Sequence, residues 1–214
     1  MNQNCTYDLK IATLNVSGLK RRLIFPEIAD LIRSNDVVCL TETHTENSDI
    51  IHFPDYSYLA NHRKQAVLRK SGGIGVFIKN SLMPYVEHVN TQNEYVLWLK
   101  ISKILTKLDE DMVLGVLYVP PEKSRFYNDE EFFKLEREIG SYSQNHKYLM
   151  LTGDFNARTA ELNDYIEPDS FLNEMFDIDN GAHTDLNKLI VLKLIRTPLS
   201  ISTRSIRMLF IHST

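Results

Sequence analysis

The chain has 214 residues, of which 43% are hydrophobic and 24% are charged, and its formal net charge is −4 at pH 7. This length fits one domain with a sizeable core, and the composition is that of an ordinary globular protein. The negative net charge excludes a protein that coats nucleic acid by bulk charge alone, although a local basic groove stays compatible with it. Two short basic runs are interpreted as solvated surface: Lys20, Arg21 and Arg22, and His62, Arg63, Lys64, Arg69 and Lys70.

Cysteine usage and the N-terminal sequence indicate the compartment. Cys5 and Cys39 form neither a disulfide framework nor a metal-binding motif, and Cys39 lies in an apolar run that predicts a buried thiol. The N-terminus is polar, without an apolar stretch of the signal-peptide type, and no segment approaches a membrane span. We therefore expect a protein that is not secreted, has no membrane partner and resides in the nucleus or cytoplasm.

The first part of the chain predicts a strand, a helix and a second strand. Residues 9–14 form an apolar run that ends in a turn, and residues 36–41 form another. Between them, residues 20–34 have apolar side chains at helical spacing, with Pro26 near the helix start.

The middle of the chain predicts a strand over 74–79, an antiparallel meander over 85–89, 95–104 and 112–119, a helix over 129–142 and a buried strand over 148–152. Beyond about residue 158 the pattern weakens. The sequence predicts a long loop over 159–188 with one helical turn near 171–176, and residues 189–214 show no clean period. Alternating strands and helices predict the α/β class.

Polar side chains follow three of the predicted strands at the point where each strand ends. They are Asn15, Glu42, and Asp154 with Asn156. Ligands bind at the ends of buried strands in α/β sheets, and Mg²⁺ favours one or two carboxylates together with water and phosphate oxygens. The pattern is compatible with a phosphoryl-transfer site, but strand-end caps and turn residues explain the same spacing.

Five segments in order resemble the endonuclease/exonuclease/phosphatase superfamily, and most closely the apurinic-type endonuclease domain of non-LTR retrotransposons. The segments are Ile11-Ala12-Thr13-Leu14-Asn15-Val16-Ser17-Gly18, Leu40-Thr41-Glu42-Thr43-His44, Ser71-Gly72-Gly73-Ile74-Gly75-Val76, Val116-Leu117-Tyr118-Val119-Pro120-Pro121 and Gly153-Asp154-Phe155-Asn156-Ala157-Arg158. The resemblance implies a four-layer α/β sandwich of two mixed β-sheets flanked by helices. It makes residues 1–158 the recognisable domain and residues 159–214 a diverged or truncated C-terminal part, with incomplete strands.

The resemblance also implies a role for each strand-end residue. Glu42 matches the metal-binding Glu of the family, and Asn15 matches an Asn near the metal and the phosphate. Tyr118 matches a Tyr that contacts the scissile phosphate, although a half-buried strand aromatic is the plainer explanation for a Tyr at this position. Asp154 matches the Asp that orients or deprotonates the attacking water, and Asn156 matches an Asn that donates to the phosphoryl oxygens.

By the same resemblance the cofactor is Mg²⁺ or Mn²⁺, and the partner is the DNA phosphate backbone, bound by a monomer. His44 and Arg158 are substrate-binding candidates, although a polar strand-end residue explains His44 equally well. Protein partners are not indicated by the sequence.

The resemblance is incomplete after Asn156. The family carries a distal Asp and a closing Ser-Asp-His, and neither His183 nor His212 has that context. We therefore expect strongly reduced activity. The alternatives are a catalytically inactive nucleic-acid-binding module, a non-functional mobile-element fragment, and a phosphatase that acts on a small phosphorylated substrate.

Overall fold

The computed structural model describes residues 8–63, 71–156 and 209–212. By its internal contacts the chain divides into one unit of residues 1–156 with 192–214 and another of residues 157–191, and the second lies outside the described residues. All elements described below belong to the first unit. The predicted division at residue 158 stays a prediction, and the helical turn predicted near 171–176 lies outside the described residues.

The first sheet has four strands in the order β1-β2-β4-β3. Its strands are β1 (Ile11–Asn15), β2 (Val37–Thr41), β3 (Tyr56–Asn61) and β4 (Ile74–Lys79). Strands β1 and β2 run parallel, whereas β4 is antiparallel to both β2 and β3. The central strand β2 is buried at all five positions, because both of its faces pack on other layers.

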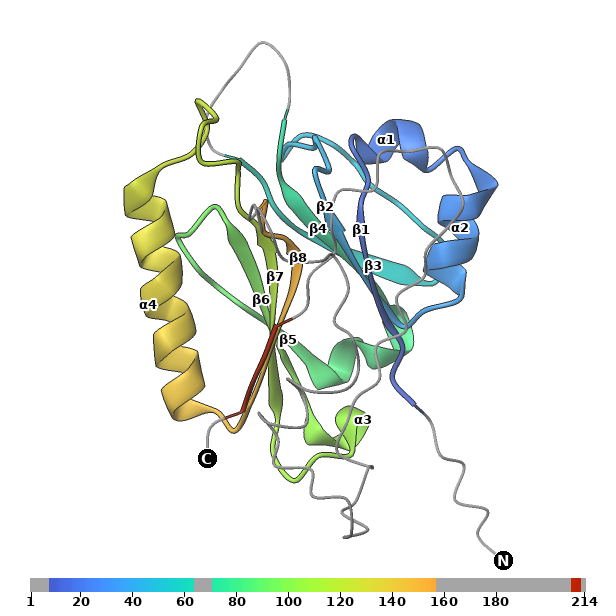
Figure 1. The fold of residues 1–214 in the computed structure, drawn as a ribbon. Helices are drawn as coiled ribbons and strands as arrows, with labels where there is room; N and C mark the ends of the chain where they lie inside the picture. Colours follow the sequence, from blue (N-terminus) through green and yellow to red (C-terminus); the bar gives the residue numbers. More distant parts are fainter. Residues whose placement is uncertain (1–7, 64–70, 157–208, 213–214) are drawn as a thin grey trace, which may run out of the picture. The chain divides into compact units, whose positions relative to one another are not determined.

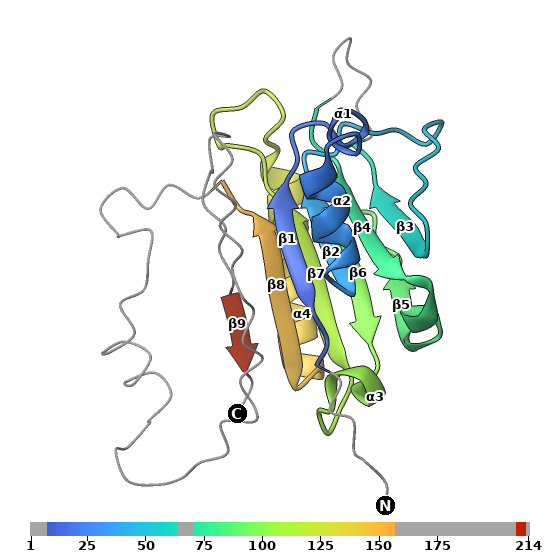
Figure 2. The same ribbon diagram turned by 90° about the vertical axis from the view of Figure 1, so that its right-hand side faces the viewer.

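The second sheet is also mixed and has the order β5-β6-β7-β8-β9. Its strands are β5 (Val86–Val89), β6 (Val96–Ile101), β7 (Met112–Tyr118), β8 (Tyr148–Asp154) and β9 (Leu209–His212). The meander β5-β6-β7 is antiparallel, as the sequence predicts, and β8 runs parallel to β7. Strand β9 pairs with β8 at the edge of the sheet (Figure 2).

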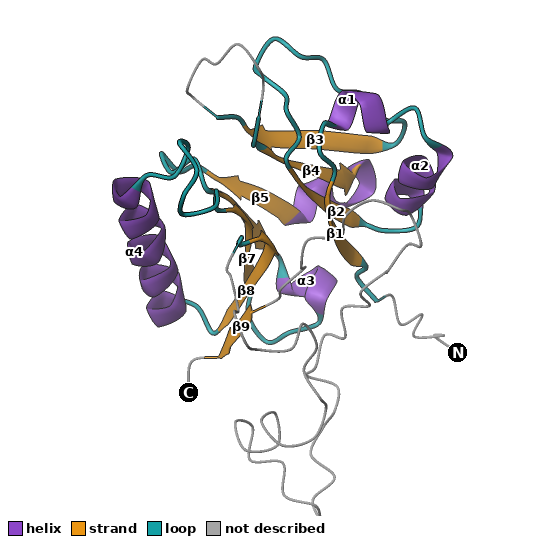
Figure 3. Ribbon diagram, turned by 45° about the horizontal axis from the view of Figure 1, so that its top comes forward, coloured by secondary structure: helices purple, strands orange, loops and turns teal. Residues whose placement is uncertain are grey.

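Helices cover the outer face of each sheet, so that the layers are helix, sheet, sheet and helix (Figures 1 and 3). Helix α2 (Pro26–Arg33) buries Ile28 and Ile32 against the first sheet, and the long helix α4 (Asp129–Asn145) buries Leu135 against the second. The short elements are α1 (Leu19–Arg22), α3 (Lys103–Thr106) and the 3₁₀ helix η1 (Asn80–Tyr85). The predicted four-layer sandwich is confirmed.

Four elements differ from the sequence prediction. The strand predicted over 95–104 ends at Ile101, and the short helix α3 begins at Lys103. The helix predicted over 20–34 is two helices, because Pro26 fixes the first position of α2 and forces the preceding Phe25 into an extended conformation. Strand β3 was not predicted, since five of its six residues are only half-buried and the apolar pattern is weak. Strand β9 lies in a stretch for which the sequence indicates no element.

Among the described residues, no helix is long and apolar enough to cross a membrane.

Candidate active site

The parallel strand pair of each sheet brings two of the predicted site residues to one edge of the sandwich. In the first sheet, Asn15 is in register with Thr41, and Glu42 follows directly. In the second sheet, Tyr118 is in register with Asp154. Because parallel strands end at the same edge, this topology places the four side chains at two neighbouring strand ends.

Two hydrogen bonds join these strand ends across the sheets. The Asn15 amide Nδ2 donates to Asp154 Oδ2 at 2.9 Å, over a separation of 139 residues. The Tyr118 hydroxyl donates to Glu42 Oε1 at 3.2 Å. The structure therefore brings together Asn15, Glu42, Tyr118 and Asp154, which the sequence could place only on separate strands.

The backbone after β8 fixes the Asp154 carboxylate. The Asn156 backbone N–H donates to Asp154 Oδ1 at 3.0 Å, and the Asn156 side chain donates to the Val119 carbonyl at 2.9 Å. Asp154 is only 5% exposed, and each of its carboxylate oxygens accepts a hydrogen bond, at 2.9 Å from Asn15 and at 3.0 Å from Asn156. The Asn156 amide keeps a second N–H for another acceptor.

Backbone strain is concentrated at this edge. Of the six described non-glycine residues with positive φ, four lie here: Ser17 (43°), Glu42 (53°), His44 (54°) and Asn156 (44°). Each such residue costs on the order of 1 kcal/mol, and strain of this kind is typical of functional sites. The turns after β1, β2 and β8 are thus held in conformations that cost free energy.

The electrostatic environment keeps Tyr118 protonated. Burial raises the pKa of the Tyr118 phenol, the neighbouring Glu42 charge raises it further, and Asp154 adds to the same effect. The charge of Arg63 acts in the opposite direction on this pKa. Tyr118 is therefore a hydrogen-bond donor at neutral pH and not a base.

The turn after β2 is held by two glycines. The Thr43 and His44 backbone N–H groups donate to the carbonyls of Gly73 and Gly72 at 3.2 and 2.9 Å. A Cβ on Gly73 would lie 2.8 Å from the Thr43 hydroxyl, so the glycine is needed for this close approach. His44 Nε2 lies 4.0 Å from Glu42 Oε2, which places His44 beside the carboxylate.

The other substrate-binding candidate, Arg158, lies outside the described residues.

The donor set at this edge suits a hydrated hard cation better than a closed metal cage. Among the described residues, no group of three or more His, Cys, Asp and Glu side chains is arranged to hold a metal ion. Mg²⁺ commonly binds through one or two carboxylates and keeps several waters. The Glu42 side chain is 26% exposed and therefore accessible to such a cation, whereas Asp154 is nearly buried. Glu42 fits as the anchor.

Two aromatic contacts at this edge were not expected from the sequence. The guanidinium carbon of Arg63 lies 5.8 Å from the centre of the Tyr118 ring and 4.3 Å from the centre of the Phe126 ring. In the sequence, Arg63 is marked only by the loose basic run at residues 62–70, and that run predicts a solvated loop. Arg63 departs from that expectation, because it is half-buried and its guanidinium lies beside aromatic rings from distant segments.

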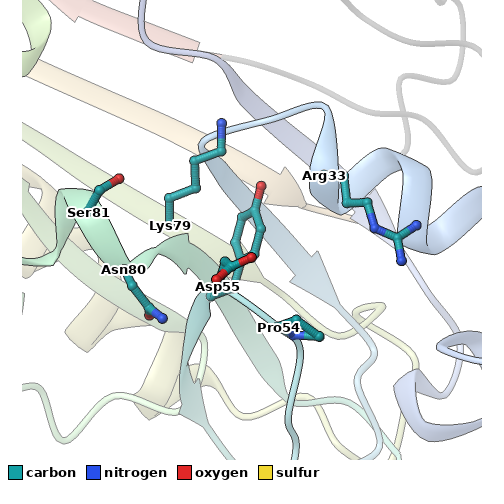
Figure 4. A pocket seen from close by; sticks show the side chains of 7 residues that line it. Arg33, Pro54, Asp55, Lys79, Asn80 and Ser81 are labelled. Atoms are coloured by element: carbon teal, nitrogen blue, oxygen red, sulfur yellow. The ribbon is translucent and has the colours of Figure 1, made fainter.

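A separate pocket of about 390 Å³ lies at the other end of the first sheet (Figure 4). Its lining includes Arg33, Asp55, Tyr56, Lys79 and Ser81. Lys79 is the last residue of β4. The first residue of β4, Ile74, is in register with Thr41, which directly precedes Glu42. The Lys79 ammonium is paired with the buried Asp36 at 2.7 Å. This pocket is therefore remote from Glu42.

Comparison with known proteins identifies the family. Residues 12–175 match the Endonuclease/Exonuclease/phosphatase family. Over 150 residues the chain is 25% identical to a protein described as "Probable RNA-directed DNA polymerase from transposon BS" of Drosophila melanogaster. The match covers 70% of this chain and 15% of that protein, so the chain corresponds to a small part of the relative.

The chain is also similar to solved structures. The Xenopus laevis APE2 catalytic domain matches with a TM-score of 0.50 and 16% identity, covering 78% of this chain and 64% of that one. A variant of the 3′ phosphatase NExo from Neisseria, bound to a product DNA hairpin, matches with a TM-score of 0.49 and 16% identity, covering 72% and 60%. The chain spans less than two thirds of either structure, and the likeness to the first shows the sandwich fold.

Proposed function

This chain belongs to the endonuclease/exonuclease/phosphatase family, and from that premise we propose that it is a DNA-hydrolysing phosphodiesterase of a retrotransposon-type protein. The observation that carries the proposal is the Asn15–Asp154 hydrogen bond of 2.9 Å beside the Tyr118–Glu42 hydrogen bond of 3.2 Å. In these contacts a nearly buried carboxylate, an accessible carboxylate and neutral donors lie at one strand edge, which supports the proposal. We further propose that the protein acts on DNA inside the cell.

In this proposal Asp154 is the base. Its carboxylate is oriented by Asn15 and by the Asn156 backbone, so it can take a proton from a water that attacks phosphorus. The new bond joins the water oxygen to phosphorus, and the bond from phosphorus to one sugar oxygen breaks. That sugar oxygen leaves and takes its proton from solvent water, because no side chain is assigned as its general acid. Because the carboxylate is already in place, little reorganisation is needed during the reaction.

The neutral donors and Glu42 serve the negative charge that develops on the phosphoryl oxygens. The Tyr118 hydroxyl, which stays protonated, exchanges its hydrogen bond to Glu42 for one to a phosphoryl oxygen, and the second N–H of Asn156 donates to these oxygens as well. Glu42 with Asn15 would hold a Mg²⁺ or Mn²⁺ ion, which supplies charge stabilisation at the phosphate when it is bound.

We propose that the 214-residue chain by itself is a weak enzyme. The sequence from residue 157 to 214 contains no Ser-Asp-His, so the family's second acid–base pair has no counterpart in it. Two absent groups, each worth about 3 kcal/mol in comparable sites, would lower the rate by about four orders of magnitude. Catalytic groups are seldom independent, so four orders of magnitude is the upper limit of the expected decrease in rate.

Nicking of supercoiled plasmid DNA tests the proposal. We expect slow, Mg²⁺-dependent conversion to the open circle by the purified chain, and loss of conversion in Asp154→Ala. DNA binding without any nicking would identify an inactive binding module instead. Turnover of small phosphomonoesters without action on DNA would identify a phosphatase.

A further inference from the structure

Arg63 lies directly beside the active edge, the group of strand ends that carries Glu42, Tyr118 and Asp154. Arg63 follows β3, and its guanidinium carbon is 5.8 Å from the Tyr118 ring centre and 4.3 Å from the Phe126 ring centre. Tyr118 ends β7, whereas Phe126 belongs to the segment between β7 and α4. The guanidinium therefore lies against the ring whose hydroxyl is hydrogen-bonded to Glu42.

Neighbouring groups fix the position of this guanidinium. Arg63 Nη1 donates to the Ser71 hydroxyl at 2.8 Å, and a Cβ on Gly72 would lie only 2.7 Å from the Arg63 guanidinium carbon. A side chain at position 72 would thus occupy the space that Arg63 uses.

The second aromatic ring is held just as firmly. The buried Tyr95 hydroxyl donates to the Phe126 carbonyl at 3.0 Å and accepts from the Asn128 N–H at 2.8 Å. The cation is therefore placed before any ligand binds, which reduces the entropy lost on binding.

The charges at this edge favour a positively charged side chain. Glu42 and Asp154 both bring carboxylates to the edge, and a phosphodiester adds a further negative charge. Arg63 is close enough for its positive charge to act on the Tyr118 hydroxyl. A guanidinium keeps its charge at any physiological pH and presents a planar set of donors that matches phosphate oxygens.

We propose that Arg63 is a substrate-binding residue of the active site and that its guanidinium donates to a non-bridging oxygen of the phosphodiester being cleaved. The inference rests on the proposed function and extends it by one residue. The Tyr118 and Phe126 rings and the Ser71 hydroxyl keep the guanidinium beside the Tyr118 ring, and its remaining N–H groups are the donors that we assign to the phosphate. This arrangement places a permanent cation on the side of the phosphate that Tyr118 serves.

The test compares two substrates and three variants of the full chain. One substrate is thymidine 5′-(p-nitrophenyl phosphate), which has a single phosphodiester and no flanking strand, and the other is supercoiled plasmid. The variants are Arg63→Gln, Arg63→Lys and the control Arg125→Gln. Arg125 is a matched control because its guanidinium carbon lies 4.6 Å from the same Phe126 ring and the residue is exposed.

We expect Arg63→Gln to lower kcat/KM on both substrates by about thirtyfold, the range for one hydrogen bond to a charged group. Arg63→Lys retains the charge but not the planar fork, so a loss of only about fivefold is expected. Arg125→Gln should stay within about twofold of the wild type on the small diester. If Arg63 only packed between the rings, Lys and Gln would lose the same stacking and the two variants would be equally impaired.

Anisotropy of a fluorescent duplex oligonucleotide separates failure of this inference from failure of the proposed function. If the wild type nicks DNA and Arg63→Gln equals it on the small diester, the inference is overturned and the proposed function stands. If the wild type binds DNA without nicking it, the proposed hydrolytic function is overturned. The inference then stands only if Arg63→Gln weakens DNA binding about tenfold while Arg125→Gln does not. A wild type that neither binds nor nicks DNA overturns both.

Discussion

Exchanging the two residues of the Asn15–Asp154 hydrogen bond provides a sharp test of the site geometry. In Asp154→Asn, the new amide oxygen can still accept from the Asn156 N–H, but its nitrogen then faces the Asn15 Nδ2 donor. Rotating the Asn15 amide does not help, because Asn15 Oδ1 accepts from the Ser17 N–H at 3.1 Å and that contact would be lost. One partly buried donor is left without an acceptor whichever way the amides turn.

The expected cost follows from that unsatisfied donor. A buried polar group without a partner costs about 1–3 kcal/mol. For a chain of this length each kcal/mol shifts Tm by roughly 2–4 °C, so a cost of about 2 kcal/mol should lower the Tm of Asp154→Asn by about 4–8 °C. The reverse single change, Asn15→Asp, places two carboxylates in contact. It should destabilise the protein at neutral pH and less so in acid, where the pair can share a proton.

The double variant Asn15→Asp with Asp154→Asn restores every hydrogen bond with the polarity reversed. The carboxylate at 15 accepts from the Ser17 N–H and from the amide at 154, whose oxygen accepts from the Asn156 N–H. We expect thermal unfolding within about 1 kcal/mol of the wild type, but no recovery of nicking, since the base has moved to the other strand. A double variant no more stable than the Asp154→Asn single variant would refute the hydrogen-bond geometry. An Asp154→Asn variant as stable as the wild type would refute the free-energy cost assigned to the unsatisfied donor.

Three further predictions follow from single residues. Glu42→Gln should abolish Mn²⁺ binding in a calorimetric titration, because a neutral amide does not replace the accessible carboxylate, and equal affinities would place the metal elsewhere. Gly153→Ala should lower the free energy of unfolding in urea by about 3 kcal/mol or more, because at φ 129° its Cβ would lie 2.0 Å from the Leu117 carbonyl oxygen. The control is Gly140→Ala in α4, where a Cβ would have no neighbour within 4 Å, and this variant should be neutral or stabilising. Burial raises the pKa of the Cys39 thiol to about 12, so the neutral thiol contributes fully to stability below pH 9, and this contribution falls as the pH rises toward 12. Iodoacetamide at pH 8 should therefore label the Cys39 peptide only in denaturant.

Much of the fold follows from local patterns in the sequence. The strands β4 and β8 are short apolar runs that end at polar residues, and their burial on both faces makes them recognisable. Helix α4 has an Asn128 N-cap and three acidic residues in its first turn, which are local signals as well. Strand β3 escapes this reasoning, because a half-buried edge strand has no continuous apolar run and no strict alternation.

The amino-acid sequence by itself determined which residues stand at the strand ends, because the apolar runs stop at Asn15, Glu42 and Asp154 and the motifs around them match one family. Only the tertiary structure decided which of those side chains touch. The Asn15–Asp154 hydrogen bond spans 139 residues, and the stacking of Arg63 on Phe126 joins two loops of different sheets. The physical reason is that burial and backbone propensity are read along a few neighbouring residues, whereas these contacts depend on how two twisted sheets pack face to face.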